Sequence, residues 1–431
     1  MKRISSLKLA AICASVSLLL PLLWSCSGGA DGVSDYKDTA TYTPQSDTLS
    51  LLLGQVNGQG LLCDIQKRID SGATFDKEQF LKGLAMVLAK RQPRDYLGGL
   101  GYGLDISYDL NNFEDSGFAL NRDMIIEKAE KAVDTVKTVD IAKTQEMGQQ
   151  YMALTEKMLN AGPKKAPKAL VDSVAQAYST LIATTISQNF ADYTRHEGKK
   201  VDLPAFFTGV RAITEKKHSV DFLAGVNAGL TIYQQIVRLE TLGVNVRFDI
   251  VLKTIEDIFK NGKADEEQLK VYDTKIQEFV DRVGKQAFAA QEKARAESDE
   301  AVQNVKTAEA LIAKLKKENP GIKTSESGLN YLVSNPGSSV KPSDNDTVVV
   351  SYTGYHLDDK EFDKGESVAF PLNAVVPGFR EGIKMLGEGG EAQLWIPGEL
   401  AYGAFGSPQG GIGPMETLKF DVKVEKIKRA K

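Results

Sequence analysis

The chain has 431 residues, of which 42% are apolar and 26% are charged, and its formal net charge is −4. This length exceeds what one compact core usually holds, so we expect two or three domains. The composition is that of a folded globular protein without the basic excess that nucleic-acid binding requires, so no nucleic-acid partner is expected. The three cysteines and three histidines are not spaced like metal ligands, and we expect neither a metal nor another cofactor.

The first residues have the plan of a secretory signal. Three basic residues among the first eight precede an apolar run over residues 9–23. The run ends in LWSC at residues 23–26, which resembles the lipobox of bacterial lipoproteins. The resemblance implies removal of residues 1–25 and lipid attachment to Cys26; the alternative is a plain secretory signal in which Cys26 is incidental. We expect a protein of the cell envelope, anchored by lipid to the outer membrane and facing the periplasm.

A polar segment follows over residues 26–46 and has too few apolar residues to form a core. We expect it to act as a flexible tether. Cys63 would then have no disulfide partner within the chain, because Cys13 is removed with the signal and Cys26 carries the lipid. The mature protein is therefore expected to lack a disulfide and to depend on packing for its stability.

Residues 47–318 have apolar positions at helical spacing and contain an internal repeat. DKEQFLKG at 76–83 recurs as DLPAFFTG at 202–209, an offset of 126 residues (202 − 76). YLGGLGYGLDI at 96–106 recurs as FLAGVNAGLTI at 222–232, at the same offset. Because the offset continues without a gap, we predict two successive copies of one helical module.

A second offset, of 45 residues, lies within each copy: Gly54 and Gly58 match Gly99 and Gly103 (99 − 54). We therefore predict four related units beginning near residues 48, 93, 174 and 219, each a glycine-bearing helix, a polar loop and a second helix. Glycines four residues apart lie on one helix face and remove side-chain bulk there. Since glycine costs about 1 kcal/mol relative to alanine inside a helix, close approach of another helix explains the pairs. The alternative is that the glycines mark frayed helix ends.

Residues 264–318 lack proline, contain one glycine and are rich in alanine, glutamate, lysine and glutamine. This composition predicts one continuous helix, roughly 80 Å long at 1.5 Å per residue. Its middle, residues 285–300, is polar nearly all round, as expected of a solvated spacer, and a coiled coil is the alternative. Apolar positions return near its end, so that end is expected to dock on another element: Val302, Val305, Ile312 and Leu315.

The last quarter of the chain has strand patterns at 328–334, 347–353, 391–397 and 417–427, with a short amphipathic helix at 378–386. Antiparallel strands around one helix predict a small α+β domain. The whole chain is thus expected to be an α+β multidomain protein. Its folded parts would be an all-α repeat region at 47–165 and 166–320, the second copy including the connecting helix, and a β-rich domain at 321–431.

Five motifs of this last domain occur in an order that resembles the FK506-binding-protein family of peptidyl-prolyl cis/trans isomerases: VVVSYTGY (348–355), EFD (361–363), VVPGF (375–379), ELAYGAFG (399–406) and TLKFDVKV (417–424). The resemblance implies a curved antiparallel sheet half-wrapped around a short helix. It also implies isomerisation of X-Pro peptide bonds, unfolded or proline-containing polypeptides as clients, and macrolide-type compounds as further ligands.

The helical units resemble the amino-terminal module of periplasmic FK506-binding proteins. In that family the module makes intertwined dimers and helps to hold unfolded clients. A homodimer through the helical region is therefore one expectation. Because the module occurs twice in this chain, pairing of the two copies with each other is the other.

The same resemblance assigns the substrate site. Tyr352, Phe362 and Phe420 would form aromatic walls around the proline ring, and Phe379 would be the floor. Phe379 stands where the family most often has tryptophan, so the floor is smaller and lacks an indole N–H.

The polar groups of the site follow from the resemblance as well. Tyr402 would donate a hydrogen bond to a substrate carbonyl, and Asp363 would lie beside the twisted carbonyl and bond Tyr352. The remaining residues would contact the substrate chain, the middle one through its backbone N–H: Val375, Val376 and Ile412.

Two further departures accompany the smaller floor at Phe379, and the altered floor together with the four helical units leaves two functional hypotheses. Val368 replaces an aromatic residue of the family, and the flap at 407–414 is glycine-rich, with serine where some members have histidine. The first hypothesis is an exported, lipid-anchored prolyl isomerase that assists the folding of exported proteins. The second is a non-catalytic holdase or scaffolding lipoprotein whose isomerase site is vestigial.

Overall fold

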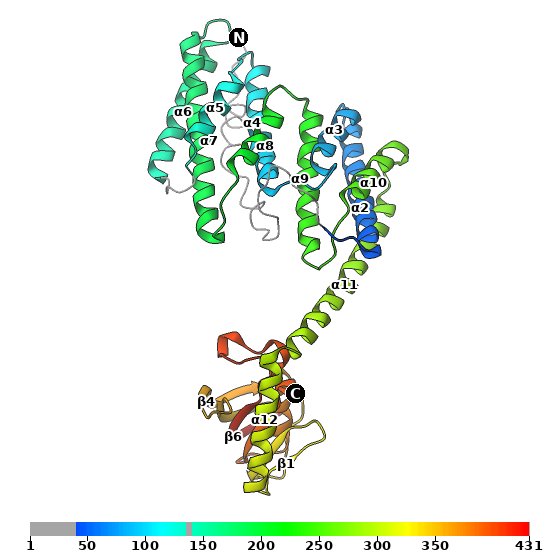
Figure 1. Ribbon diagram of the computed structural model, residues 1–431, viewed down its shortest axis with the longest axis vertical. Coiled ribbons are helices and arrows are strands. Elements are labelled where there is room, and N and C mark those ends of the chain that lie inside the picture. The colour runs from blue at the N-terminus through cyan, green and yellow to red at the C-terminus, as the bar shows by residue number, and fades with distance from the viewer. Residues whose placement is uncertain (1–39, 135–139, 431) are drawn as a thin grey trace. The chain divides into compact units, whose positions relative to one another are not determined.

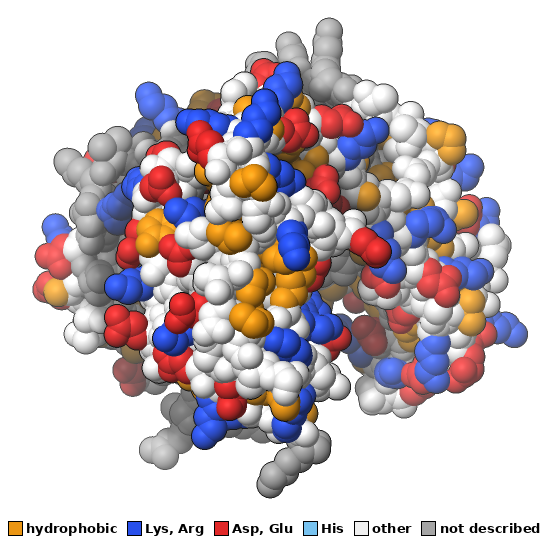
Figure 2. Space-filling model, turned by 90° about the horizontal axis from the view of Figure 1, so that it is seen from below, with side chains coloured by type: hydrophobic (Ala, Val, Ile, Leu, Met, Phe, Trp, Pro, Cys, Tyr) orange, Lys and Arg blue, Asp and Glu red, His pale blue; other side chains and the backbone are white. Residues whose placement is uncertain are grey.

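A computed structural model describes residues 40–134 and 140–430 of the chain (Figure 1). The expected signal peptide, Cys26 and most of the expected tether lie outside these described residues. The chain divides into two compact units, Met1–Val283 and Gly284–Lys431. On the face shown in Figure 2, acidic and basic side chains are interspersed. Within the described ranges, no helix is long and apolar enough to cross a membrane.

The first unit is helical throughout the residues that the structure describes, and it ends within α11. Its helices are α2 (Pro44–Asp70), α3 (Lys77–Leu88), α4 (Arg94–Asp115), α5 (Arg122–Ala132), α6 (Ile141–Ala161), α7 (Lys168–Glu197), α8 (Leu203–Thr214), α9 (Val220–Glu240), α10 (Phe248–Asn261) and α11 (Glu266–Ala296).

Long and short helices alternate in this unit, with α6 as an insertion between α5 and α7. Residues at equivalent positions of the sequence repeat begin equivalent helices. The side chain of Asp76 caps α3 by accepting a hydrogen bond from the backbone N–H of Gln79. Asp202 caps α8 in the same way, through the N–H of Ala205. Such caps satisfy backbone donors that have no partner inside the helix, so the repeated aspartate defines the same boundary twice.

The main helix contacts join segments that are far apart in the sequence. α2 packs on α10 and α3 on α9, whereas α4 packs on α8 and α5 on α7. The first four of these helices share one hydrophobic core, to which α4, α8 and α11 also contribute, and the second four share another with α6. We call α2, α3, α9 and α10 the outer group, and α4, α5, α7 and α8 the inner group, after their order along the chain. In both groups, each long helix packs on a short helix from the other half of the unit.

Glycines make these helix contacts close. A Cβ atom on Gly99 would overlap the carbonyl oxygen of Phe206 in α8, and Gly225 makes the corresponding approach to α3. On α2, a Cβ atom on Gly58 would lie 2.9 Å from Cδ1 of Ile258 in α10. The prediction that the paired glycines allow another helix to approach is confirmed, because any side chain there would meet the neighbouring helix.

The expectation of one unbroken helix over residues 264–318 is wrong. α11 ends at Ala296, and α12 (Asp299–Glu318) begins after a break. Ser298 has extended backbone angles and caps α12, its Oγ accepting a hydrogen bond from the N–H of Ala301 (3.3 Å). Serine competes in this way for helix backbone, and the good helix formers on both sides hide the break in the sequence pattern.

The second unit contains a six-stranded sheet in the order β1-β2-β5-β6-β3-β4, with every pairing antiparallel. Its strands are β1 (Lys323–Thr324), β2 (Asn330–Asn335), β3 (Thr347–Tyr355), β4 (Glu361–Pro371), β5 (Glu391–Ile396) and β6 (Leu418–Lys428). One short α-helix, α13 (Pro377–Lys384), lies between β4 and β5 in the chain. A helical region followed by an antiparallel sheet with one short helix confirms the predicted α+β class.

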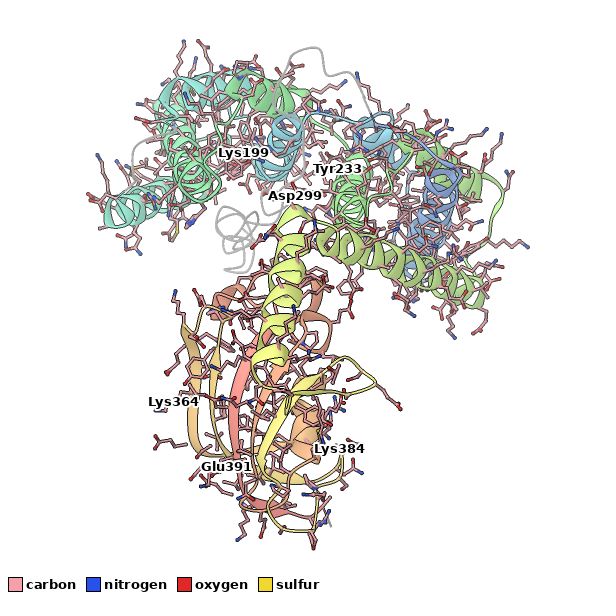
Figure 3. The ribbon with its side chains drawn as sticks, turned by 60° about the horizontal axis from the view of Figure 1, so that its bottom comes forward. Lys199, Tyr233, Asp299, Lys364, Lys384 and Glu391 are labelled. Atoms are coloured by element: carbon pink, nitrogen blue, oxygen red, sulfur yellow. The ribbon has the colours of Figure 1, made fainter. Side chains whose placement is uncertain are left out.

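α13 and α12 lie against opposite faces of this sheet. Phe379 and Ile383 of α13 share a core with Leu394 of β5. Ile312 of α12 packs instead with Trp395, and consecutive residues of a strand point to opposite faces. Figure 3 shows α12 running along the sheet from Asp299 at its start. The end of the connector therefore docks, as predicted, through Ile312 and Leu315, whereas Val302 of the predicted stripe is 40% exposed. We call the face that carries α13 the inner face.

Candidate active site

Five aromatic side chains from four elements meet on the inner face, and we call them the aromatic cluster. The ring centroids of Phe379 and Phe420 are 5.3 Å apart, and those of Phe362 and Phe420 are 5.7 Å apart. Tyr352 lies 6.0 Å from Phe379 and 5.7 Å from Phe370. Edge-to-face contacts predominate, which is a favourable geometry for aromatic pairs. The structure thus brings the four predicted aromatic residues together and adds Phe370.

The cluster grades from a buried floor to more exposed walls. Phe379 and Phe420 are each 5% exposed, so Phe420, expected as a wall, is as buried as the floor, whereas Tyr352 and Phe362 are half-buried. α13 can place Phe379 this deep because it has glycine where it meets the sheet: a Cβ atom on Gly382 would overlap the side chain of Leu394. An apolar ligand would therefore contact mainly the half-buried side chains, above a floor that is already shielded from water.

The polar edge of the cluster is formed around Asp363. The hydroxyl of Tyr352 donates to Oδ2 of Asp363 (2.8 Å), and Oδ1 accepts from the backbone N–H of Lys364 (2.9 Å). Burial, together with the hydrogen bond to Asp363, raises the pKa of Tyr352 to about 12. Burial, followed by the charge of Asp363, also raises the pKa of Tyr402. Both hydroxyls therefore keep their protons at neutral pH and can serve as hydrogen-bond donors.

Tyr402 is the most accessible of the predicted site residues on the turns. It directly precedes the 3-10 helix η4 (Gly403–Phe405), and 41% of its surface is exposed. Val375 and Val376 join the 3-10 helix η2 (Leu372–Ala374) to α13 and pack against the same core as the aromatic cluster. Val376 is the N-cap residue of α13 and has non-helical backbone angles, so it lies at the helix entrance beside the site.

The flap at 407–414 is closed on itself at its base. The N–H of Ser407 donates to the carbonyl oxygen of Ile412 (2.9 Å), and the N–H of Ile412 donates back (3.0 Å). The 3-10 helix η5 (Pro408–Gly410) forms the turn between them. Ile412 is 5% exposed and belongs to the core that contains Phe379 and Phe420. The predicted apolar residues thus form one cluster, with Asp363 and Tyr402 at its exposed edge.

Sequence reasoning missed three residues at the border of the site. Phe370 could have been detected, because it is an aromatic residue on the same strand as Phe362. His356 and Glu416 gave no signal, since they are 60 residues apart in the sequence. The His356 ring lies 5.3 Å from the ring of Phe362, and its Nδ1 lies 2.5 Å from Oε1 of Glu416.

The site can act on a ligand through apolar contact and hydrogen bonds. It offers an apolar aromatic floor and, at its edge, two protonated hydroxyls and a carboxylate. Such a surface binds a twisted amide, whose carbonyl carries less charge, better than the hydrated planar amide. Across residues 40–134 and 140–430, no group of three or more His, Cys, Asp or Glu side chains is placed to hold a metal ion.

The domain has the features of a prolyl isomerase: the sheet order, the short helix on the inner face and the aromatic cluster. A family model described as FKBP-type peptidyl-prolyl cis-trans isomerase matches residues 338–425. A second, described as the domain amino terminal to FKBP-type peptidyl-prolyl isomerase, matches residues 217–333.

The curated relatives extend this match beyond the sheet. The FKBP-type peptidyl-prolyl cis-trans isomerase FkpA of Escherichia coli (strain K12) is 37% identical over 215 residues, covering 48% of this chain and 75% of the relative. The outer membrane protein MIP of Legionella longbeachae is 29% identical over 229 residues, covering 52% of this chain and 91% of the relative. The chain therefore belongs to the FKBP-type peptidyl-prolyl cis-trans isomerase family.

A solved structure is also similar. The crystal structure of FkpA from Escherichia coli shares 36% sequence identity and covers 48% of this chain and 94% of its own, with a TM-score of 0.29. Residues before 217 lie outside both family models.

Proposed function

We propose that this protein catalyses the cis/trans isomerisation of X-Pro bonds in exported polypeptides and so assists their folding. The observation that carries the proposal is the aromatic cluster with the Tyr352–Asp363 hydrogen bond at its edge. Rotation about an X-Pro bond is slow because it breaks amide resonance, at a barrier of roughly 18–20 kcal/mol. A site needs only to favour the twisted amide to lower that barrier.

In the proposed mechanism the proline ring rests on Phe379. Tyr352, Phe362 and Phe420 surround it and exclude water from the amide. The planar amide has the larger charge separation, so loss of hydration penalises it more than the twisted form. The aromatic surface thus contributes by making the ground state less favourable relative to the transition state.

The polar residues orient the substrate. Tyr402 donates its hydroxyl to a substrate carbonyl, and Asp363 lies beside the carbonyl that twists. The backbone N–H of Val376 holds the substrate chain, with Val375 and Ile412 in apolar contact beside it. The raised pKa values of Tyr352 and Tyr402 support their use as neutral donors.

An isomerisation assay with a proline-containing tetrapeptide and the full chain tests the proposal. We expect a rate above the uncatalysed one that is lowered by Asp363→Ala. Asp421→Ala is the matched control, because that carboxylate bonds Gln393 (2.9 Å) outside the aromatic cluster. If the wild-type chain gives only the uncatalysed rate, the holdase or scaffolding alternative takes its place. The smaller floor at Phe379 is the observation that favours that alternative.

We also propose that the helical region contains two copies of the family's amino-terminal module, paired within one chain. The offset of 126 residues equates α3 with α8 and α4 with α9, so the α3–α9 contact corresponds to the α8–α4 contact. The glycine contacts correspond as well, since Gly99 meets α8 as Gly225 meets α3. This correspondence supports the doubled module, and we propose unfolded polypeptides as its clients.

Client holding is testable against a denatured protein prone to aggregate. We expect the full chain to suppress aggregation, and Asp363→Ala to suppress it equally well, because the helical region would hold the client. A fragment of residues 284–431, which has its own core, should hold poorly. Equal holding by the fragment would contradict this division of labour.

Export and lipid attachment at Cys26 complete the proposal. A relative named outer membrane protein MIP supports a place in the cell envelope, and the LWSC sequence at 23–26 supports the anchor. Mass spectrometry of the membrane-extracted protein should show an acylated Cys26 as the first residue. A Cys26→Ser chain recovered equally from membranes would contradict the anchor.

Saturable binding of a macrolide such as FK506 would test the aromatic site independently of catalysis.

A further inference from the structure

The connector between the helical repeats and the sheet contacts the rim of the isomerase site. Near the end of α11, the ring of Phe288 stacks on the ring of Phe405, with centroids 5.2 Å apart and planes 20° apart. The guanidinium of Arg295 lies 5.0 Å from the centroid of the same Phe405 ring. Phe405 ends η4, the turn that follows Tyr402. The connector therefore packs against the turn that directly follows Tyr402, whose hydroxyl is proposed to bind the substrate.

α12 makes a second contact, with the flap. Nδ2 of Asn304 donates a hydrogen bond to the carbonyl oxygen of Pro414 (2.9 Å). A Cβ atom on Gly413 would lie 3.1 Å from Asn304 Nδ2 and 3.1 Å from Oε1 of Glu300. The flap thus passes α12 so closely that a side chain at position 413 would have little room.

The same stretch of flap is held from the side of the sheet. Oε2 of Glu416 accepts a hydrogen bond from the N–H of Gly413 (2.7 Å), and its Oε1 lies 2.5 Å from Nδ1 of His356. The N–H of Met415 donates to the carbonyl oxygen of Gly403 in η4 (2.9 Å). Residues 413–416 are therefore fixed by α12, by the loop after β3 and by the η4 turn together.

We propose that Asn304, with Arg295, is a positioning residue for the isomerase reaction and that the functional isomerase unit begins in the connector rather than at residue 321. The proposal rests on the proposed function, because the groups positioned are Tyr402 and Ile412. Asn304 fixes the end of the flap that carries Ile412, and Arg295 covers the turn that follows Tyr402. Glycine-rich loops lose much conformational freedom when they are ordered, and contacts that order them beforehand favour the productive geometry.

The test compares Asn304→Asp and Asn304→Ala in the full chain. Aspartate keeps the size of asparagine but has no N–H to donate. Because its charge would also lie near the carboxylate of Glu300, the uncharged Asn304→Ala variant is compared with it. We expect both variants to lower kcat/KM for a proline tetrapeptide about tenfold, the effect of roughly one lost hydrogen bond. The matched control is Gln303→Ala, because that exposed amide donates a hydrogen bond to Thr307 of the same helix (3.1 Å) rather than to the flap.

Two further readouts separate flap positioning from loss of fold. Trp395 packs with Ile312 of α12, so its fluorescence should stay unchanged in Asn304→Asp if α12 remains docked. Hydrogen exchange of the peptide that covers 412–416 should become faster in Asn304→Asp and not in Gln303→Ala. Unchanged exchange and activity in Asn304→Asp would overturn the proposal, as would a shift of Trp395 emission that accompanies the loss. If the wild-type chain is inactive, the proposed function fails, while the exchange measurement still decides whether Asn304 orders the flap.

Discussion

The proposed role of Tyr402 depends on its hydroxyl group, which donates a hydrogen bond to a substrate carbonyl. We predict that Tyr402→Phe lowers kcat/KM about tenfold, or about 1.4 kcal/mol, which is the contribution of one hydrogen bond to the substrate. The thermal midpoint should remain unchanged, because 41% of the side chain is exposed. Tyr355→Phe is the matched control, since that ring contacts Lys419 (5.0 Å) rather than the aromatic cluster. An equal loss in both variants would remove Tyr402 from the site.

Tyr352 predicts a pH dependence of stability. Its pKa is about 12 in the folded chain, against an ordinary value of 10.0, because of burial and its bond to Asp363. Above pH 10 the unfolded chain loses this proton before the folded chain does, so the free energy of unfolding falls as the pH rises from 10 toward 12. Below pH 10 the contribution is fully present.

Urea unfolding of the second unit, followed through Trp395 at pH 8 and pH 11, measures this effect. The stability difference between the two pH values should be smaller in Tyr352→Phe than in the wild type, because phenylalanine has no proton to lose. An identical difference in both chains would contradict the assignment of the shift to Tyr352.

At the scale of elements, the glycines of the long helices can be tested against each other. We predict that Gly99→Ala destabilises the protein by about 1–3 kcal/mol, because its Cβ would overlap the carbonyl oxygen of Phe206 and force α4 and α8 apart. Gly148→Ala in α6 should instead stabilise by up to about 1 kcal/mol, since that glycine has open space around it and alanine is the better helix former. Chemical denaturation of the full chain, followed by circular dichroism, measures both.

The opposite signs are the decisive feature of this pair. Gly225→Ala should resemble Gly99→Ala, because Gly225 meets the carbonyl oxygen of Phe80 in the same manner. Stabilisation by all three substitutions would show that the helices tolerate greater separation than their packing implies.

These helices also show what the sequence can and cannot predict. The spacing of Gly54 and Gly58 predicted that another helix approaches α2 closely, and it does. The spacing could not predict that the partner is α10, because partner choice depends on the whole core rather than on one face. The break at Ser298 was hidden for a related reason, since its cap is one local hydrogen bond within a stretch of strong helix formers.

The site, too, has residues that the sequence predicts and contacts that it does not. The family resemblance carried by the five motifs implied that Tyr352, Phe362, Phe379 and Phe420 meet, because each motif is local and readable in the sequence. The contact of Asn304 with Pro414 joins residues 110 positions apart and follows no motif. Contacts of that kind arise from how α12 docks on the sheet, which composition alone does not define.

At the scale of the whole molecule, the pairing of helices predicts the oligomeric state. Each long helix of the outer and inner groups already packs on a short helix of the same chain. We therefore predict that the delipidated protein is a monomer at micromolar concentration, because the surfaces that would pair between copies are occupied within one. Light scattering coupled to size-exclusion chromatography measures the mass directly. A mass twice that of the chain would restore the homodimer through the helical region.

The order of the helix groups along the chain has a consequence for how the protein is made. The inner group is complete once α8 has ended at Thr214, but α2 has no partner until α10 has followed, at residues Phe248–Asn261. A chain that leaves the ribosome or a translocation channel amino terminus first therefore exposes α2 longer than the other helices of these two groups. Prior closure of the inner group shortens the effective loop that the outer group must close and so reduces its entropic cost. During its own synthesis, the protein is thus a nascent chain in which α2 is still without its partner helix, the kind of molecule that its proposed activity serves.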